Sequence, residues 1–285
     1  DDFDEAAPPT HPQAATYVGQ LNEHNKFHGT GSIAWPDGRK YAGQWRDNVI
    51  EGTGVMQWED GSLYKGDFKN GLREGKGVHT FADGGVYSGL FKEGKRHGWG
   101  RRVYADGRIY EGDYREELQE GTGTMKWPDG SEYKGGFKQG RKHGHGRMFW
   151  AHNGETYEGD WYHDSRHGQG VRTYTDGRLY RGSYYKNAQH GLGELRNSNG
   201  STFMGKWYHG KKHGEGLAID KHGTASVEVW NNGALVLARA LEGINVRSTR
   251  EGLSSPSHSP TQNAPLAGDT TEDDDDDDDE EGEAI

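Results

Sequence analysis

The sequence predicts an all-β protein: a single-layer antiparallel β-ribbon of tandem hairpins (a repeat solenoid), followed by a disordered acidic C-terminal tail. Three observations predict this fold. One phrase of aromatic residues and glycines recurs nine times, at steps of 23 or 24 residues. Within each phrase an aromatic residue, a glycine and usually a second ring stand at positions 1, 3 and 5, so all three project from one face of a strand. Only 30% of the residues are hydrophobic but 11% are aromatic, which indicates rings buried on a thin sheet rather than a thick aliphatic core.

Each copy begins with an aromatic residue, which defines position 1 of the repeat. These residues are Tyr17, Tyr41, Tyr64, Tyr87, Tyr110, Tyr133, Tyr157, Tyr180 and Phe203. Position 3 is glycine and position 5 is a second ring in most copies, so all three project from one face of a strand. The glycine leaves room for a neighbouring ring to lie over the backbone. The repeat-defining residues of the central copies are Tyr41, Gly43, Trp45, Tyr87, Gly89, Phe91, Tyr110, Gly112, Tyr133, Gly135, Phe137, Tyr157, Gly159 and Trp161.

Two connections join the strands of neighbouring copies. Asp-Gly or Asn-Gly at positions 20 and 21, as in Asp106-Gly107, predicts a tight turn, because glycine supplies the positive φ that such turns need. The other connection contains His-Gly-x-Gly or Glu-Gly-x-Gly and is expected to be a solvated loop. A single hairpin is marginal in water, so we expect eighteen strands to pair edge to edge in one ribbon.

The composition divides the chain into four segments. Residues 1–16 are expected to be disordered, residues 17–225 hold the nine repeats, and residues 226–240 form a degenerate half-repeat that caps the open sheet edge. Residues 241–285 form the acidic tail, with 14 acidic and 2 basic residues. The net charge of -11 therefore hides an array that carries about +5. This charge is too small and too diluted for a phosphate-tracking surface, so no nucleic-acid partner is expected.

No catalytic, metal-binding or cofactor-binding residue is predicted, and we do not expect an enzyme. The chain has no cysteine and no G-x-S-x-G motif, and its Gly-x-Gly sequences lack the strand-to-helix context of phosphate loops. The histidine column at position 11 is the strongest metal candidate. Neighbouring copies lie about 9.5 Å apart, however, which is too far for two imidazoles on one zinc ion. The absence of cysteine favours a reducing compartment such as the cytosol.

Two surfaces are candidates for partner binding. Position 16 differs in residue type between copies of an otherwise regular repeat, as a surface that recognises a specific partner requires. The candidate partner surface therefore consists of position-16 residues: Ile33, Met56, Met125, Met148, Arg102 and Arg172. The connection that contains His-Gly-x-Gly also carries basic residues, among them Arg96, Lys142, Lys211 and Lys212. They could form a stripe for anionic lipid or an acidic protein. Alternatively, these charges discourage aggregation between sheet edges.

The pattern Y-x-G-x-[WF]-x-x-G-x-x-H-G-x-G, complete at residues 133–146, resembles the MORN (membrane occupation and recognition nexus) repeat. The resemblance implies a curved ribbon that organises protein complexes, with lipid-head-group binding in some members. It favours a cytoplasmic scaffold for the proteins of a cytoskeletal, ciliary or flagellar (axonemal) assembly, of which the radial spoke head is one version. A peripheral membrane module that binds anionic phospholipid is the alternative. The resemblance also raises the expectation of a homodimer through the C-terminal repeats.

Overall fold

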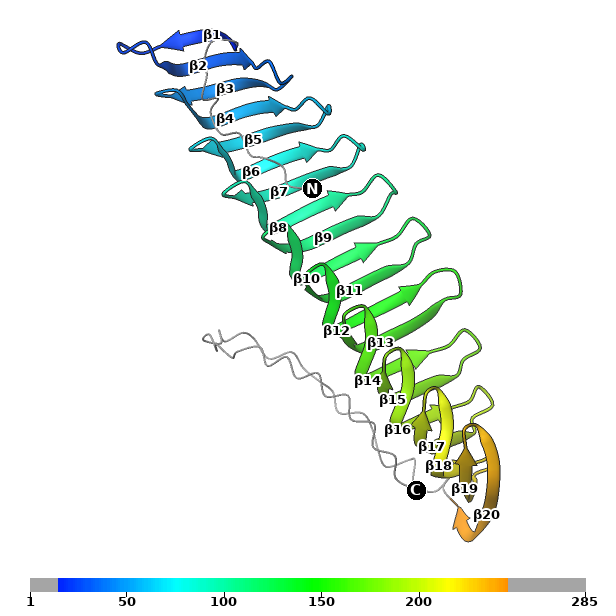
Figure 1. Cartoon of the computed structure of the whole chain (residues 1–285). Helices are drawn as coiled ribbons and strands as arrows, with labels where there is room; N and C mark the ends of the chain where they lie inside the picture. Colours follow the sequence, from blue (N-terminus) through cyan, green and yellow to red (C-terminus); the bar gives the residue numbers. More distant parts are fainter. Residues whose placement is uncertain (1–14, 246–285) are drawn as a thin grey trace, which may run out of the picture. The chain divides into compact units, whose positions relative to one another are not determined.

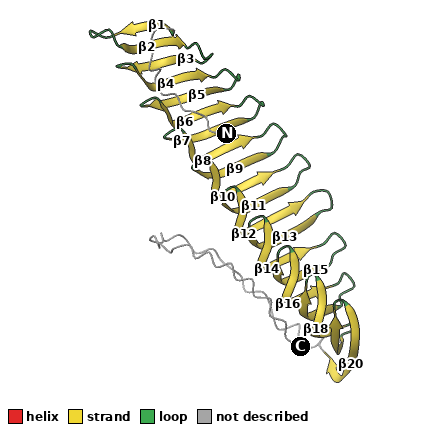
Figure 2. Cartoon of the chain, viewed as in Figure 1, coloured by secondary structure: helices red, strands yellow, loops and turns green. Residues whose placement is uncertain are grey.

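The computed structural model describes residues 15–245, and this part of the chain consists of β-strands without helices (Figures 1 and 2). The all-β prediction is confirmed. The strands are β1 (Thr16–Leu21), β2 (Phe27–Ala34), β3 (Lys40–Arg46), β4 (Val49–Gln57), β5 (Leu63–Lys69), β6 (Leu72–Thr80), β7 (Val86–Lys92), β8 (Lys95–Val103), β9 (Ile109–Arg115), β10 (Leu118–Lys126), β11 (Glu132–Lys138), β12 (Arg141–Trp150), β13 (Glu155–Tyr162), β14 (Ser165–Thr173), β15 (Leu179–Tyr185), β16 (Ala188–Arg196), β17 (Thr202–Tyr208), β18 (Lys211–Ile219), β19 (Thr224–Asn231) and β20 (Ala234–Asn245).

Each strand pairs antiparallel with the strand before it and the strand after it, so the order of strands in the 20-stranded sheet follows the chain. The predicted eighteen strands become twenty because the half-repeat forms its own hairpin, β19–β20. This hairpin continues beyond residue 240, since Thr224 of β19 is still paired with Asn245 of β20. The predicted tail therefore begins later than residue 241. The acidic run and residues 1–14 lie outside the described residues.

In repeats 2 to 9 the connection inside the repeat is shorter than the sequence pattern indicated. It is a two-residue turn at positions 7 and 8, both with positive φ, for example 47° at Glu116 and 73° at Glu117. Such turns match the twist of the two strands they join. In repeat 1 a longer connection joins Leu21 of β1 to Phe27 of β2. His-Gly-x-Gly lies in the following strand instead, where Gly144 in β12 (φ +69) occupies a bulge in the pairing with β11.

The Asp-Gly turns between repeats form as predicted. At Asp106 the carboxylate oxygen accepts a hydrogen bond from the Arg108 amide at 3.0 Å, and the Gly107 amide donates to the Tyr104 carbonyl at 2.9 Å. Gly107 has a φ of +85°, a conformation that L side chains rarely adopt.

Glycines form a row across the sheet. Gly112 in β9 is paired with Gly100 in β8 and with Gly123 in β10, so positions 3 and 14 of successive copies lie opposite one another. A Cβ atom on Gly112 would lie 2.5 Å from the Gly123 Cα atom and 2.6 Å from the Tyr110 hydroxyl. The sheet can thus accommodate the tyrosine ring only over bare backbone.

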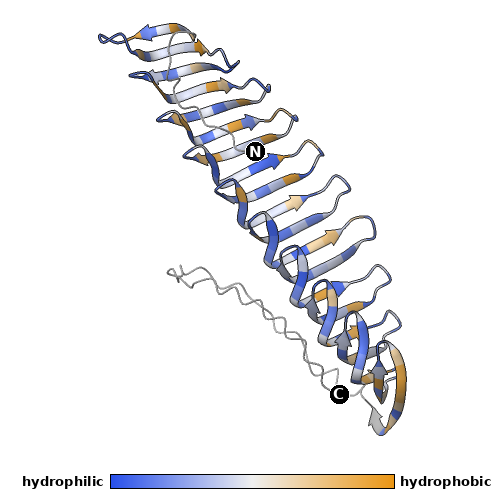
Figure 3. Ribbon diagram, viewed as in Figure 1, coloured by the Kyte–Doolittle hydropathy of each residue, from blue (hydrophilic) through white to orange (hydrophobic). Residues whose placement is uncertain are grey.

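The core is a continuous row of rings on one face of the sheet. Tyr110 meets Tyr114 of its own copy at a centroid distance of 5.2 Å and Phe137 of the next copy at 5.0 Å, both edge to face. The Tyr110 hydroxyl donates to the Asp113 carbonyl at 3.0 Å, and burial raises the pKa of this hydroxyl. Because each ring contacts two copies, the repeats are coupled to their neighbours. Figure 3 shows hydrophobic and hydrophilic residues interspersed along the strands of the ribbon.

Candidate interaction surfaces

The sheet has two unlike faces, which we name the ring face and the groove face. The ring face carries the rings of positions 1, 5 and 18, and the side chains of position 16. The groove face carries the side chains of positions 2, 4, 13 and 15, which no second layer of the described residues covers. The repeat-defining tyrosines lie in the buried row of the ring face and the repeat-defining glycines lie beneath them.

The structure corrects part of the predicted partner surface. Ile33, Met56, Met125 and Met148 are buried, with 1% of Met56 exposed, so their side chains do not meet solvent. The reason is the strand register: Met56 in β4 is paired with Tyr41 in β3 and with Tyr64 in β5. Position 16 therefore fills the spaces between tyrosines in the core.

Arg102 and Arg172 occupy the same position but remain partly exposed. The Arg102 guanidinium lies 3.8 Å from the centroid of Phe81, and burial lowers the pKa of this group. Arg172 pairs with the Glu155 carboxylate at 2.5 Å and lies 4.4 Å from the centroid of Tyr174. Both arginines thus cover position-18 rings with their planar groups.

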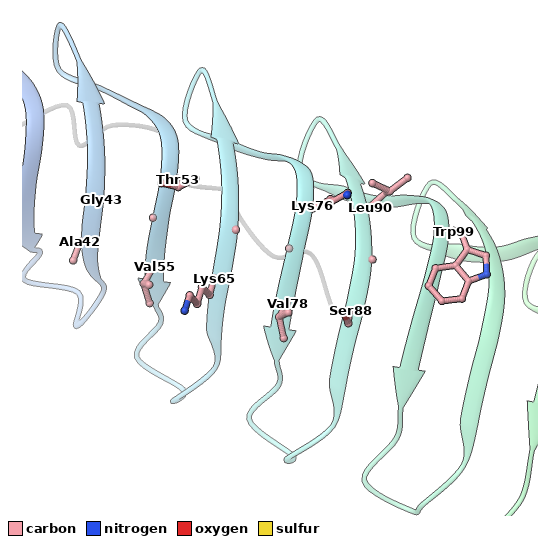
Figure 4. A pocket seen from close by; sticks show the side chains of 14 residues that line it. Ala42, Gly43, Thr53, Val55, Lys65, Lys76, Val78, Ser88, Leu90 and Trp99 are labelled. Atoms are coloured by element: carbon pink, nitrogen blue, oxygen red, sulfur yellow. The ribbon is translucent and has the colours of Figure 1, made fainter.

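The groove face holds an open apolar groove of about 850 Å³ across β3 to β8 (Figure 4). Its apolar side chains include Val55, Val78, Leu90 and Trp99, and the bare glycine row forms part of its floor. Trp99 is 56% exposed, which is unusual for so large a ring. Lys65 and Lys76 add positive charge among these side chains.

This groove was not predicted from the sequence, although the residues that form it depart from the pattern of the other copies. Its residues occupy positions 2, 4, 13 and 15, which carry polar residues in many other copies. Beyond Trp99 the face becomes polar, beginning with the Arg101–Glu111 ion pair at 2.8 Å. Apolar residues at positions facing away from the rings are therefore a local departure from the repeat, confined to the N-terminal copies and to a few sites such as Leu192.

The position-11 column does not gather a metal site among residues 15–245, where no group of three or more His, Cys, Asp or Glu side chains is suitably placed. Glutamates in this column instead support the next turn. The Glu74 carboxylate accepts from the Glu93 amide at 2.9 Å, and Glu120 accepts from the Gln139 amide at 3.0 Å. Histidines in the same column contact rings at a tilted angle, as His143 contacts Tyr162 with a distance of 5.3 Å between ring centroids.

The last strand presents an apolar edge segment. Leu235, Val236 and Leu237 of β20 are all at least half exposed. Dimerisation through the C-terminal repeats stays a prediction, and this segment is where we expect such a contact.

The model of the MORN repeat family matches nine consecutive copies that cover most of the sheet. The matched residues are 17–38, 41–63, 64–86, 87–107, 110–132, 133–152, 157–177, 180–202 and 203–219. The chain belongs to the MORN-repeat family. Each matched copy begins at the position-1 aromatic residue of a repeat, so the family model and the rows of rings and glycines have the same period. The MORN repeat is a non-catalytic module of protein-binding or membrane-binding scaffolds.

Solved structures similar to this MORN-repeat chain share little sequence with it. One is the TCP10 domain of Danio rerio CPAP in complex with a peptide of Danio rerio STIL, at 11% identity and a TM-score of 0.30, covering 79% of this chain and 99% of that chain. Another is the TCP domain of SAS-4 (dCPAP) of Drosophila melanogaster in complex with a proline-rich motif of Ana2 (dSTIL), at 14% identity and a TM-score of 0.27, covering 70% of this chain and 94% of that chain. A comparison with curated proteins finds no significant match. In the described part of the MORN chain, no helix has the length and apolar character needed to cross a membrane.

Proposed function

We propose that this MORN-repeat protein is a non-enzymatic scaffold that binds a segment of a partner protein in the groove of β3 to β8, within a cytoplasmic, cytoskeletal or ciliary assembly. The observation that carries the proposal is the exposed Trp99 near Leu90, in one open groove with Val55 and Val78. Exposed tryptophans on rigid surfaces are typical of the residues that dominate binding energy.

The chemistry of the groove describes the partner segment. Apolar side chains of the partner would cover Val55, Val78, Leu90 and Trp99, and acidic side chains beside them would meet Lys65 and Lys76. Because the ring row couples neighbouring copies, the groove is held in shape before binding, which reduces the entropy cost of association.

Affinity purification from ciliated cells tests the scaffold function. The full-length chain is compared with Trp99→Ala combined with Leu90→Ala, and with the control Leu192→Ala. Leu192 shares position 13 with Trp99 and is 67% exposed, but it lies outside the groove. We expect one or more axonemal or cytoskeletal proteins with the wild type and the control, and their loss with the groove variant. Recovery of the same proteins with all three chains would refute the groove, and the absence of cytoskeletal proteins would refute the assembly.

Anionic phospholipid is the second candidate partner, because several turns of the last four repeats expose basic side chains such as Arg141 and Lys211. Sedimentation with vesicles of neutral lipid and of 30% phosphatidylserine tests it. Lipid binding predicts co-sedimentation with the anionic vesicles alone. Equal recovery in the supernatant with both vesicle types would remove this function.

A further inference from the structure

The two-residue turns inside the repeats form one edge of the sheet, and the charge of this edge changes abruptly along the chain. In repeats 2 to 5 the turn segments 46–51, 69–74, 92–97 and 115–120 contain seven Lys or Arg, seven Asp or Glu and one His. In repeats 6 to 9 the segments 138–143, 162–167, 185–190 and 208–213 contain seven Lys or Arg, one Asp and six His. We name these last four segments the basic edge.

The turns of repeats 2 to 5 carry equal numbers of acidic and basic residues, and two ion pairs join the turns of repeats 4 and 5. Lys95 pairs with Glu116 at 2.5 Å, and the Arg96 guanidinium pairs with the Glu117 carboxylate of the next turn, also at 2.5 Å. On the basic edge Asp164 is the single acidic residue, and its carboxylate accepts from the Lys142 amide at 3.0 Å. Lys142, Arg166 and Lys212 lie over rings of the core, whereas Arg141, Lys186 and Lys211 are exposed. With one Asp among seven Lys or Arg, the edge is a cationic strip that attracts anionic ligands.

The uncharged residues of the basic edge also differ from those of the first turns. Position 6 carries Arg or Lys in repeats 2 to 6, but it is tyrosine in repeats 7 to 9: Tyr162, Tyr185 and Tyr208. These three rings are 54%, 40% and 48% exposed. Exposed tyrosine combined with cationic side chains is the composition of a protein-binding surface.

Rings and histidines form a ladder along this edge. Tyr162 lies 5.3 Å from His143 and 5.8 Å from His167, measured between ring centroids. The pattern recurs at Tyr208, which lies 5.4 Å from His190 and 5.7 Å from His213. Each exposed tyrosine is therefore held between imidazoles of successive copies, and its orientation is fixed before any ligand arrives.

We propose that the basic edge binds an acidic, carboxylate-rich segment of a partner protein. Four turns spaced two strands apart span six strand intervals, or ~29 Å at about 4.8 Å each. An extended peptide of about nine residues has this length. Its carboxylates would meet the exposed cations of repeats 6, 8 and 9, and its backbone and aliphatic groups would lie on the three tyrosines. This surface is separate from the groove, so the inference stands or falls independently of the groove partner, whereas anionic phospholipid would compete for the same cations.

A labelled deca-aspartate peptide and the full-length chain test the proposal by fluorescence anisotropy at low salt. The test variant combines Arg141→Gln, Lys186→Gln and Lys211→Gln, three exposed cations of the basic edge. The control variant combines Lys69→Gln, Lys92→Gln and Arg115→Gln, three exposed cations of the first turns with the same change in net charge. We expect the test variant to weaken binding at least tenfold and the control less than twofold.

Equal losses in the two variants would overturn the proposal, because they would show a response to net charge alone. Absence of peptide binding by the wild type would overturn it as well. Vesicles of 30% phosphatidylserine and an oligothymidine of ten nucleotides serve as competing polyanions. If either is bound more tightly than the peptide and with the same sensitivity to the test variant, the edge is a lipid or nucleic-acid site and the proposal is wrong.

A second variant, Tyr162→Ala with Tyr185→Ala and Tyr208→Ala, changes no charge on the basic edge. We expect it to weaken the peptide at least threefold through the loss of ring contacts, while circular dichroism keeps the wild-type melting temperature within a few degrees. Unchanged affinity would overturn the role of the tyrosines and leave only a charged strip, contrary to the proposal.

Discussion

Replacing Gly112 with alanine tests whether the glycine row is required by the ring row above it. The added Cβ atom would lie 2.5 Å from the Gly123 Cα atom, 2.5 Å from the Thr122 carbonyl oxygen and 2.6 Å from the Tyr110 hydroxyl. Ordinary van der Waals contact begins near 3.4 Å. Two of these neighbours are backbone of the paired strand, so relief requires a shift of β10 as well as displacement of the tyrosine. Overpacking typically costs about 1–3 kcal/mol, and we expect at least the upper end here; valine should cost more.

Gly140→Ala is the matched control, because it separates backbone strain from steric overlap. Gly140 has a φ of +78°, and a Cβ atom there would meet nothing within 4 Å. We expect a loss of about 1 kcal/mol from the left-handed conformation alone. Urea unfolding followed by circular dichroism measures both, and hydrogen exchange should show the Gly112→Ala loss centred on β9 and β10. A Gly112→Ala protein as stable as wild type, or no less stable than Gly140→Ala, would refute the assignment of ring and glycine to one face.

Two further predictions concern buried polar groups. Tyr133→Phe removes the hydroxyl that donates to the Gly136 carbonyl at 3.0 Å, so we expect a loss of about 1 kcal/mol in urea unfolding; a loss below 0.3 kcal/mol, roughly the error of such measurements, would contradict it. Burial, together with the charges of Arg73, Arg96 and Arg102, lowers the pKa of His79 to about 3. The unfolded chain therefore takes up a proton that the folded chain does not, and wild-type stability should fall by up to about 1.4 kcal/mol per pH unit below pH 6.5. His79→Met, the residue found at this position in three other copies, should flatten this dependence between pH 7.5 and 5; parallel stability curves would refute it.

The repeat frame could be predicted from sequence because it depends on local rules. Rings and glycine at positions 1, 3 and 5 share a face in any strand, and Asp-Gly predicts a turn wherever it occurs between strands. The fate of position 16 depends instead on the register between two strands. The turn at positions 7 and 8 alone would pair position 1 with position 14. The bulge opposite the residue between Gly43 and Trp45 shifts this register by two residues, so Met56 at position 16 lies opposite Tyr41 at position 1. Positions 7 and 8 vary in residue type, with Glu116-Glu117 in one copy and His209-Gly210 in another, so no single turn signature identifies them.

The groove was not predicted from the sequence, and the basic edge was predicted only as a stripe without limits, which included the ion-paired Arg96. A search for what recurs finds the frame, whereas the groove and the basic edge are departures from the repeat. The groove consists of apolar side chains such as Val78 and Leu90 at positions that are elsewhere polar. The basic edge consists of turns that lack the glutamates of earlier copies. Comparing the copies position by position, once the two faces are known, reveals both.

The locations of the two surfaces have a consequence for how the molecule works. The groove extends over β3 to β8, and the basic edge lies at the turns between β11 and β18. Each copy buries its rings against its neighbours alone, so substitutions on the groove face or at the turns leave the ring row unchanged. One partner can therefore be lost without the other: Trp99→Ala should leave binding of the acidic peptide intact, and neutralising Arg141, Lys186 and Lys211 should leave the groove partner bound. A ribbon that binds two chains at separate strands fixes the distance between them, which a compact domain with one pocket does not do.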